Sequence, residues 1–383
     1  MSATPKLLFL VAEDWYFCSH RLPLALAARE AGYEVIVVTR VNQHAEVIRA
    51  AGLTLIPLQR MRRAGARPLQ ELTSLGELWG IYRRERPDLV HHVGLKPVVY
   101  GSLVAHIVGV RGLVNALAGL GFVFSSGRLF ARLLRPIIKF MFSCLLNRKN
   151  ARVIVQNERD RDVLTNQVGI DSANVCLIRG AGVDLRLYGA QPPSVQPPLI
   201  VLIARMLWDK GVGDFVEAAN RIRDAGVQAR FALIGIPDPE NPTSVPESQL
   251  RAWHDGGKVE WWGYRSDIPA VLNMASIACL PTFYGEGVPK ALIEAMASSR
   301  AIVTTDIPGC RELVAGGRSG ILVPPWDVPA LSAALESLIL DPDRCRQMGI
   351  TGRLMVEQSL SLQQVLKETL TLYTYLVPTK VAE

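Results

Sequence analysis

Short, fully apolar segments alternate with helical patterns along this chain, and this alternation restricts the fold more than any other feature. Residues 6–12 form a continuous apolar run, residues 22–31 show helical periodicity, and residues 34–39 are rich in β-branched side chains. Strands without a polar face are typical of parallel sheets that helices cover on both sides. The chain is therefore expected to be an α/β protein.

The same pattern continues in two blocks. In the first half, further strands are predicted at residues 53–57, 88–92, 112–116, 151–156 and 175–178. In the second half, strands are predicted at residues 199–204, 229–234, 258–262, 277–280, 301–305 and 321–323, and residues 329–376 are predicted to be helical. Four prolines lie between the blocks, in residues 191–198, which is typical of a linker.

This organisation predicts two doubly wound parallel-sheet domains with a ligand cleft between them, because ligands of such sheets bind at the carboxyl ends of the strands. We expect a first domain over residues 1–190, a linker over 191–198, a second domain over 199–355, and a C-terminal helix over 356–383 that crosses back to the first domain. A length of 383 residues agrees with two domains.

Composition excludes several classes of protein. With 49% hydrophobic and 20% charged residues, the chain is too apolar to be disordered. The six cysteines stand far apart without a CxxC pair, so we expect neither disulfides nor a zinc site. We find no signal peptide pattern and no apolar window long enough to span a bilayer, and therefore expect a cytoplasmic protein.

Charge is divided unevenly between the halves. The net charge is +7, but residues 1–190 carry +11 and residues 191–383 carry −4. An asymmetry of this size indicates that the first half alone meets an anionic partner, either nucleic acid or a membrane surface.

Two segments of the second half carry candidate binding chemistry. Arg205 follows a strand and Lys210 precedes a helix, so both cations can reach one anion, although two solvated surface cations would give the same pattern. Residues 283–296 read FYGEGVPKALIEAM, in which Gly285, Gly287 and Val288 precede Pro289 at a helix start. Backbone amides at such a start form an anion site, most simply for phosphate.

The two carboxylates of this segment, Glu286 and Glu294, are separated rather than paired. Glu294 lies about 7.5 Å along the helix from Pro289, whereas Glu286 lies in the loop. A glycosidase pair converges on one bond at roughly 5 to 9.5 Å. This spacing better suits two carboxylates that accept hydroxyls from different parts of an extended ligand.

Together, Arg205, Lys210 and the E-x7-E pair Glu286 and Glu294 resemble the retaining glycosyltransferases of family 4, which have the GT-B fold of two facing Rossmann-like domains. The resemblance implies that Arg205 and Lys210 bind the donor diphosphate, that Glu286 meets the transferred sugar and that Glu294 holds the ribose hydroxyls. Residues 259–264, ending in Tyr264, resemble the stretch that packs against the nucleobase.

The first half resembles family members that extend bacterial lipid-linked oligosaccharides, in residues 19–25, 91–97 and 119–124. The resemblance implies roles for His20 and His92 in catalysis and for Lys96 and Gly121 near the acceptor. The family's functional histidine stands five residues after the strand's Asp; here that position is Val93, so a purely structural role for the strand-end histidines stays open.

Residues 111–157 contain eight bases and no acid. Arg128, Arg132, Arg135 and Lys139 are spaced as one helical stripe beside apolar residues, which predicts either a solvated face or a surface that touches anionic lipid and a diphosphate-linked acceptor. No recognition motif accompanies the charge, so nucleic acid is not expected as a partner. The Gly119-Leu120-Gly121 pair is too short for a dinucleotide fingerprint.

From these residues and the resemblance we expect a metal-independent, retaining glycosyltransferase without a cofactor. It would move an N-acetylhexosamine-type sugar from a UDP-sugar to a polyprenyl-diphosphate-linked glycan, as a peripheral protein on the inner face of the cell membrane. The D-x-D triplet at Asp160 falls early in a predicted helix and is not expected to bind metal. A soluble acceptor, or a non-catalytic nucleotide-sugar-binding module, are the alternatives.

Overall fold

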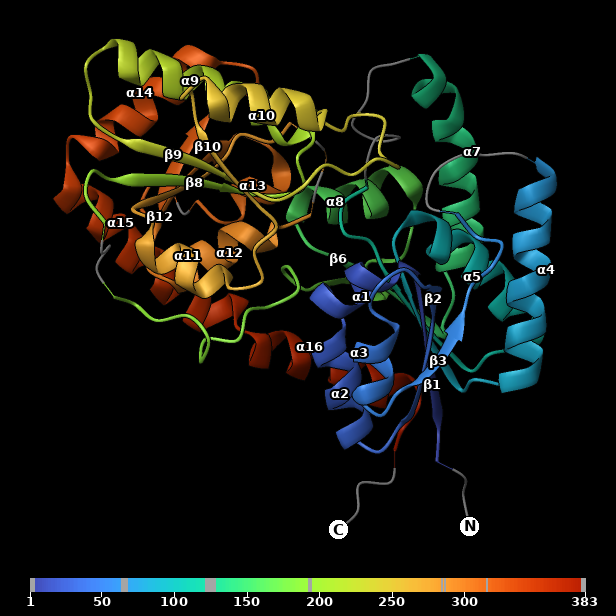
Figure 1. The fold of residues 1–383 in the computed structure, drawn as a ribbon. Helices are drawn as coiled ribbons and strands as arrows, with labels where there is room; N and C mark the ends of the chain where they lie inside the picture. Colours follow the sequence, from blue (N-terminus) through green and yellow to red (C-terminus); the bar gives the residue numbers. More distant parts are fainter. Residues whose placement is uncertain are drawn as a thin grey trace. The chain divides into compact units, whose positions relative to one another are not determined.

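The computed structural model describes residues 4–62, 68–120, 129–191, 195–283, 285, 287–314 and 316–379. They belong to two compact units (Figure 1). The first unit contains the residues up to Ala181 and those from Val365 onward, and the second contains Gly182–Gln364.

The first unit is built on a seven-stranded parallel sheet. Its strand order is β3-β2-β1-β4-β5-β6-β7. The strands are β1 (Lys6–Glu13), β2 (Glu34–Arg40), β3 (Thr54–Pro57), β4 (Leu89–Val93), β5 (Gly112–Ala116), β6 (Ala151–Val155) and β7 (Val175–Leu177). Every residue of β4, β5 and β6 is buried, which explains why these strands lack the polar alternation of a one-faced sheet.

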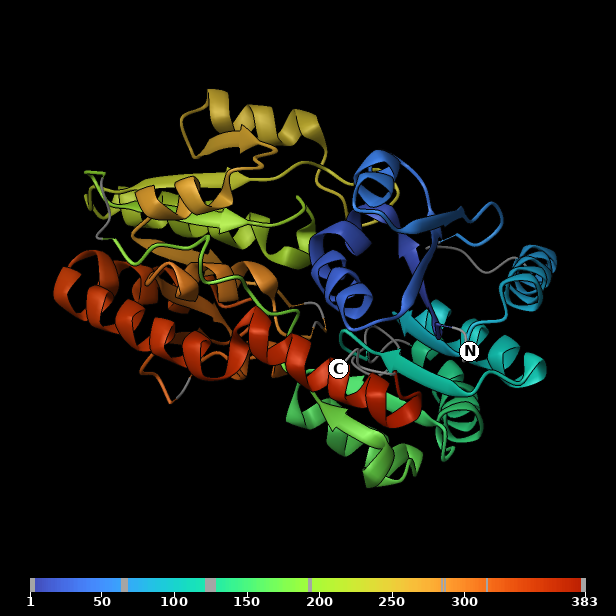
Figure 2. The ribbon, with the colours of Figure 1, turned by 90° about the horizontal axis from the view of Figure 1, so that it is seen from below.

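Helices cover both faces of this sheet (Figure 2). Helices α4 (Pro68–Glu85), α5 (Leu95–Val108) and α7 (Leu129–Leu146) pack on one face, against residues such as Leu8 and Val153. On the other face lie α1 (Asp14–His20), α2 (Leu22–Glu30), α3 (Ala45–Ala50) and α16 (Leu362–Leu376). Tyr373 of α16 is fully buried there, so the end of the chain completes the core of the first unit.

The second unit repeats the arrangement with six parallel strands in the order β10-β9-β8-β11-β12-β13. The strands are β8 (Leu199–Ile203), β9 (Arg230–Ile234), β10 (Glu260–Gly263), β11 (Ile277–Leu280), β12 (Ala301–Thr305) and β13 (Gly320–Val323). The helices that surround it include α9 (Val212–Asp224), α10 (Glu247–Asp255), α11 (Ile268–Met274), α12 (Lys290–Ala297), α14 (Val328–Ile339) and α15 (Pro342–Met355). In both sheets the order reverses beside the first strand, and this switch point is where such folds bind ligands.

The predicted strands are confirmed, each end within two residues. The chain enters the second unit at Gly182, however, and not at the proline-rich segment 191–198, because Val183 and Tyr188 pack into the core of the second unit. It returns to the first unit at Val365 rather than at residue 356. Val183 pairs with Ser361, so the segments on which the chain enters and leaves the second unit lie side by side.

Candidate active site

Two loops meet at the switch point of the second sheet. The first follows β8 and the second follows β11. Gly211 has a φ of +73°, and a Cβ there would lie 2.2 Å from the carbonyl oxygen of Pro281. The Asp209 carbonyl oxygen accepts hydrogen bonds from the Thr282 hydroxyl at 3.0 Å and from the Phe283 N–H at 3.1 Å. The two loops are therefore locked together, which only glycine at position 211 permits.

Arg205 lies at the start of the first loop, directly beyond the carboxyl end of β8. Its Nη1 pairs with Oδ2 of Asp238 at 2.5 Å, and its side chain is 38% exposed. Asp238 is held in turn by a 3.0 Å hydrogen bond from its N–H to the Ser244 hydroxyl. The guanidinium is thus positioned by its neighbour while it keeps access to solvent.

Lys210 ends the short helical turn Trp208–Lys210 of the same loop. Burial lowers the pKa of Lys210 to about 7, and the nearby charge of Arg205 acts in the same direction. An anion bound beside both cations would reverse this shift, because it favours the charged lysine. The loop is consequently suited to a ligand with at least one negative charge, such as a phosphate or diphosphate.

The second loop leads into α12. Gly287 and Val288 are buried, Gly285 is partly exposed, and Pro289 takes the N-cap position directly before Lys290. Within α12, Glu294 is only 8% exposed. Its Oε1 accepts a 2.9 Å hydrogen bond from the Tyr188 hydroxyl and lies 3.2 Å from Nζ of Lys290. Glu286 lies outside the described residues.

Tyr264 follows β10 at the same carboxyl edge of the second sheet. Its side chain is 70% exposed, and Gly263 before it has a φ of +67°. Ile236, two residues beyond the end of the neighbouring strand β9, is 49% exposed. An exposed aromatic ring and an exposed aliphatic side chain at this edge are of the right kind to contact a flat base.

In the first unit, His20 and Lys96 lie near the carboxyl edge of the sheet. His20 ends α1 and stacks on Tyr16 with ring centroids 4.2 Å apart. Lys96 lies in the first turn of α5, and its Nζ contacts Oε1 of Glu71 at 2.8 Å. Gly121 lies outside the described residues.

The structure contradicts a catalytic role for His92. Its ring is fully buried, Nδ1 lies 2.7 Å from Oδ1 of Asn115, and Nε2 lies 3.0 Å from the Tyr82 hydroxyl. Burial lowers its pKa to about 4, against the opposing effect of the Asn115 hydrogen bond. Neighbouring His91 is equally buried and lies 2.5 Å from the Tyr373 hydroxyl. Both histidines belong to the core, the structural alternative left open by the sequence.

Sequence reasoning missed an Asp-His pair at this edge. Asp14 is fully buried, and its carboxylate accepts N–H groups of Trp15, Asn42 and His44 at 2.7 to 2.9 Å. Burial alone would raise the pKa of Asp14, but these backbone hydrogen bonds outweigh it and lower the pKa. Its Oδ1 lies 3.8 Å from Nδ1 of half-exposed His44. Only the position of Asp14 directly after a strand could have indicated this pair.

The predicted basic stripe is only partly described. Arg128 lies outside the described residues, as does the side chain of Arg132. Pro136 lies inside α7, which continues through it. Arg135 and Lys139 are half-buried, and Nζ of Lys139 donates to Oε1 of Gln167 at 3.3 Å. The exposed large side chains of the described part of α7 are instead apolar: Ile137 at 57% and Phe140 at 71%.

Two features are absent from the described residues. No three or more of their His, Cys, Asp and Glu side chains are grouped to hold a metal ion. No helix among these residues combines the length and the apolar character that crossing a bilayer requires.

Each unit matches a known glycosyltransferase family model. Residues 197–341 match the family model "Glycosyl transferases group 1", and residues 6–157 match "Glycosyl transferase 4-like". This chain belongs to the family 4-like glycosyltransferases. The matches cover strands β1 to β6 of the first sheet and the whole second sheet, including both loops of the switch-point site.

Individual relatives are similar to this glycosyltransferase over most of its length. One is the N,N'-diacetylbacillosaminyl-diphospho-undecaprenol alpha-1,3-N-acetylgalactosaminyltransferase of Campylobacter jejuni, 27% identical over 85% of this chain and 87% of that protein. Another is glycogen synthase of Mycobacterium tuberculosis, 26% identical over 92% of this chain and 89% of that protein.

Solved structures show the fold. HepE of Anabaena in complex with UDP-glucose has a TM-score of 0.76 at 18% identity, over 96% of this chain and 99% of that one. Sucrose-phosphate synthase of Thermosynechococcus elongatus has a TM-score of 0.78 at 18% identity, over 97% and 99%. The predicted GT-B class of two parallel-sheet α/β domains is therefore confirmed for this glycosyltransferase.

Proposed function

We propose that this glycosyltransferase moves a sugar of the N-acetylhexosamine type from a UDP-sugar to a polyprenyl-diphosphate-linked glycan and retains the anomeric configuration. The observation that carries the donor half of this proposal is the pair Arg205 and Lys210 at the switch point of the second sheet. A lysine whose pKa is lowered to about 7 beside an arginine favours an anionic ligand.

The reaction would proceed on one face of the donor sugar. The bond between the anomeric carbon and the leaving phosphate oxygen breaks, and the acceptor hydroxyl oxygen forms the new bond. The acceptor's proton passes to the departing phosphate oxygen, so no protein nucleophile is required. Arg205, Lys210 and the amides before α12 would stabilise the negative charge that grows on the UDP diphosphate.

The other donor contacts follow from the family resemblance. Glu294 would accept the ribose hydroxyls, with its carboxylate oriented by Tyr188. Glu286 would meet the transferred sugar, and Tyr264 would pack against the base. The chain's cations would replace a metal ion, so neither a metal nor an organic cofactor is part of this proposal.

Two observations support the proposed acceptor: the name of a relative and the positive charge of the first half of the chain. The name of the Campylobacter jejuni relative specifies an undecaprenol-diphosphate-linked acceptor and an alpha linkage. Retention at an α-linked nucleotide sugar would give such a product. The charge of +11 on residues 1–190 suits both a diphosphate-linked acceptor and an anionic membrane surface. We place the protein at the inner face of the cell membrane.

A soluble glycan is the second candidate acceptor. The similarity to a glycogen synthase extends over 92% of this chain and favours it. A nucleotide-sugar-binding module without catalysis is the remaining alternative, and any transfer of the donor sugar would exclude it.

The test has two stages. In the first, a panel of UDP-, GDP- and ADP-sugars is compared by the rise that each causes in the melting temperature, since only ligands of the folded state stabilise it. We expect a UDP-N-acetylhexosamine to give the largest rise. In the second, that donor is offered with a polyprenyl-diphosphate-linked glycan or with a maltooligosaccharide. Transfer only to the soluble glycan would overturn the acceptor assignment, and stabilisation only by GDP- or ADP-sugars would overturn the donor assignment.

A further inference from the structure

Helix α4 carries large apolar side chains on the face that it turns away from the core. Its buried positions include Ser74, Leu78, Ile81 and Tyr82. On the opposite side Leu69 is 79% exposed, Leu72 is 65% exposed and Trp79 is 43% exposed. A helix on the surface of a globular domain normally turns its apolar face inward and a polar face outward, so this second apolar face requires a partner.

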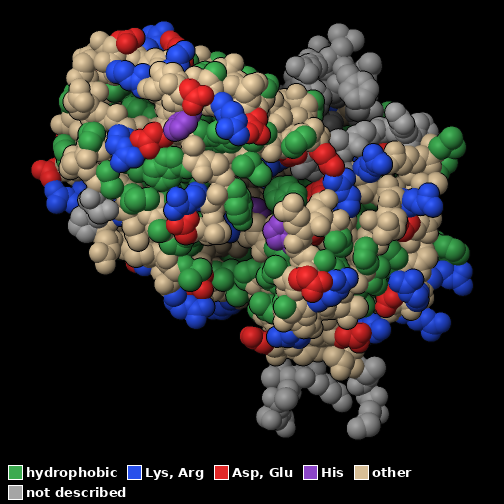
Figure 3. Space-filling model, viewed as in Figure 1, with side chains coloured by type: hydrophobic (Ala, Val, Ile, Leu, Met, Phe, Trp, Pro, Cys, Tyr) green, Lys and Arg blue, Asp and Glu red, His purple; other side chains and the backbone are tan. Residues whose placement is uncertain are grey.

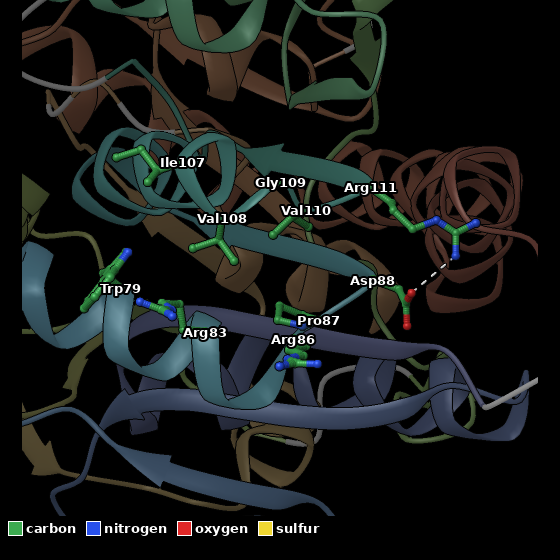
Figure 4. A pocket seen from close by; sticks show the side chains of 10 residues that line it. All are labelled: Trp79, Arg83, Arg86, Pro87, Asp88, Ile107, Val108, Gly109, Val110 and Arg111. Carbon is green, nitrogen blue, oxygen red and sulfur yellow. Dashed lines mark hydrogen bonds and ion pairs between the residues drawn. The ribbon is translucent and has the colours of Figure 1, made fainter.

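A basic groove continues this face. It is open, has a volume of about 540 Å³ and lies between the C-terminal parts of α4 and α5 (Figure 4). Trp79 and Arg83 line it from α4, and Ile107, 66% exposed, lines it from α5. Arg86 and Arg111, and the acid Asp88, also line it just before β4 and β5. The groove is therefore at the amino edge of the first sheet, away from the carboxyl edge that holds Lys96.

The charge of this region is positive. The Arg83 guanidinium lies 4.8 Å from the centre of the Trp79 ring. Arg111 pairs with Asp88 at 3.3 Å, whereas Arg83 and Arg86 form no ion pair with any described residue. The exposed positions of the described α4 side chains include no acid. Hydrophobic and basic side chains lie together along the edge of the molecule over α4 (Figure 3).

We propose that Leu69, Leu72, Trp79 and Ile107, together with Arg83 and Arg86, form a docking surface for an anionic lipid bilayer. We call these residues the α4–α5 surface. Exposed leucines enter the boundary of the acyl chains, tryptophan prefers the level of the head groups, and arginines attract anionic lipids. Charge complementarity favours an anionic bilayer, because Arg83 and Arg86 form no ion pair with any described residue and lie beside exposed apolar side chains.

The position of this surface suits the proposed reaction, and the inference rests on that proposed function for its biological meaning. Lys96, expected near the acceptor, contacts Glu71, which lies on α4 between Leu69 and Leu72 in the sequence. One end of the docking surface therefore lies on the same helix as the carboxylate that contacts Lys96. An enzyme held on the bilayer at this place would meet a glycan carried by a membrane-embedded polyprenyl chain.

The test is flotation of the full chain with vesicles, without donor or acceptor. We expect binding to vesicles that contain phosphatidylglycerol and at least tenfold weaker binding to pure phosphatidylcholine. Binding should weaken between 0.1 M and 1 M salt, as the Debye length falls from about 10 Å to about 3 Å. Some binding should resist salt because of apolar insertion.

Three variants locate the contact. The triple variant Leu69→Ser, Leu72→Ser, Trp79→Ser should lower partitioning at least tenfold. Its control is Leu340→Ser, Ile350→Ser, Leu354→Ser, which alters exposed apolar side chains of the second unit and should bind vesicles as the parent does. The double variant Arg83→Gln, Arg86→Gln should weaken binding roughly fivefold per removed cation. In addition, brominated lipids should quench fluorescence in the parent, and Trp79→Phe should remove most of that quenching.

Several results would overturn the proposal. They are an absence of binding to phosphatidylglycerol vesicles, parental binding by the Leu69, Leu72 and Trp79 triple variant, or dimerisation of the parent through this surface in sedimentation analysis without vesicle binding. Stabilisation by nucleotide sugars is measured on the same samples. If vesicles do not bind but nucleotide sugars still stabilise the protein, only the docking surface is refuted. If vesicles bind but no nucleotide sugar stabilises the protein, only the donor assignment is refuted.

Discussion

The Tyr188 hydroxyl donates a 2.9 Å hydrogen bond to Oε1 of Glu294, and thereby joins the segment that enters the second unit to helix α12. Arg353 supports this contact, because its Nη1 donates to the Tyr188 carbonyl oxygen at 2.6 Å. Glu294 thus has a set orientation before any ligand binds. The proposed ribose contact depends on this orientation.

Tyr188→Phe should raise the KM for the nucleotide-sugar donor about fivefold to tenfold and leave kcat within about twofold, because it removes one hydrogen bond to a charged group from a positioning residue. The discrimination between a ribose and a deoxyribose donor should shrink in parallel. Steady-state kinetics with both donors measures this. Tyr375→Phe, an exposed control on α16, should change neither quantity. An unchanged KM in Tyr188→Phe would remove Glu294 from the donor site.

Arg205→Ala and Lys210→Ala should each lower kcat/KM about 100-fold or more, by analogy with other lost donors that stabilise a leaving group. Near-parental turnover in both variants would refute the diphosphate assignment.

Lys210→Met should stabilise the free enzyme while it removes activity. In the parent, folding lowers the pKa of Lys210 from 10.5 to about 7, so the charged lysine opposes folding. The free-energy cost of keeping this lysine in the folded state grows as the pH falls from about 10 to 7. The gain in melting temperature over the parent should therefore be larger at pH 6 than at pH 9. If Lys210→Met melts at a lower temperature than the parent at pH 6, the charged lysine does not destabilise the free enzyme and this prediction is wrong.

Donor binding should take up protons near neutral pH. With its pKa lowered to about 7, Lys210 is partly neutral near that pH in the free enzyme, and a bound diphosphate raises its pKa. A nucleotide sugar itself does not titrate there, so a fraction of a proton is taken up per donor bound, and affinity falls as the pH rises above 7. Calorimetry in buffers of different ionisation enthalpy measures the uptake. Lys210→Met should show none, and an equal uptake in that variant would assign the proton elsewhere.

Gly211→Ala should destabilise the second unit severely. The added Cβ would lie 2.2 Å from the Pro281 oxygen, at a φ of +73°. Gly226→Ala is the matched control, since its φ is +80° with no atom within 4 Å of the new Cβ. It should cost about 1 to 2 kcal/mol, whereas Gly211→Ala should cost at least about 2 kcal/mol more. Thermal unfolding followed by circular dichroism compares the two; equal losses would mean that the loops move apart easily.

EDTA should leave the transfer rate within about twofold, because protein cations are proposed to stabilise the leaving diphosphate. The rate is measured before and after chelation, with Mg²⁺ and Mn²⁺ added back. A strict requirement for either ion would refute the metal-free site.

The distribution of strands, and with it the fold class, was predictable from local sequence. The sequence LIVLI of β8 is apolar at every position, as is the stretch LLFLVA within β1, which leaves a parallel sheet covered on both faces as the arrangement that buries them. Local sequence also predicted that Arg205 follows a strand and that Lys210 precedes a helix, whereas the donor-binding roles of these two residues and of Glu294 stay predictions.

The tertiary structure alone decided which polar residues lie in the core and which apolar residues lie outside it. His92 reads like a site residue, but Tyr82 and Asn115 satisfy its ring inside the first unit, and neither partner is close to it in sequence. The Tyr188 contact with Glu294 spans 106 positions. Likewise, the periodicity of α4 shows two apolar faces but not which one the sheet covers. Sequence determines such local periodicity, whereas burial and hydrogen-bond partners depend on contacts between distant segments.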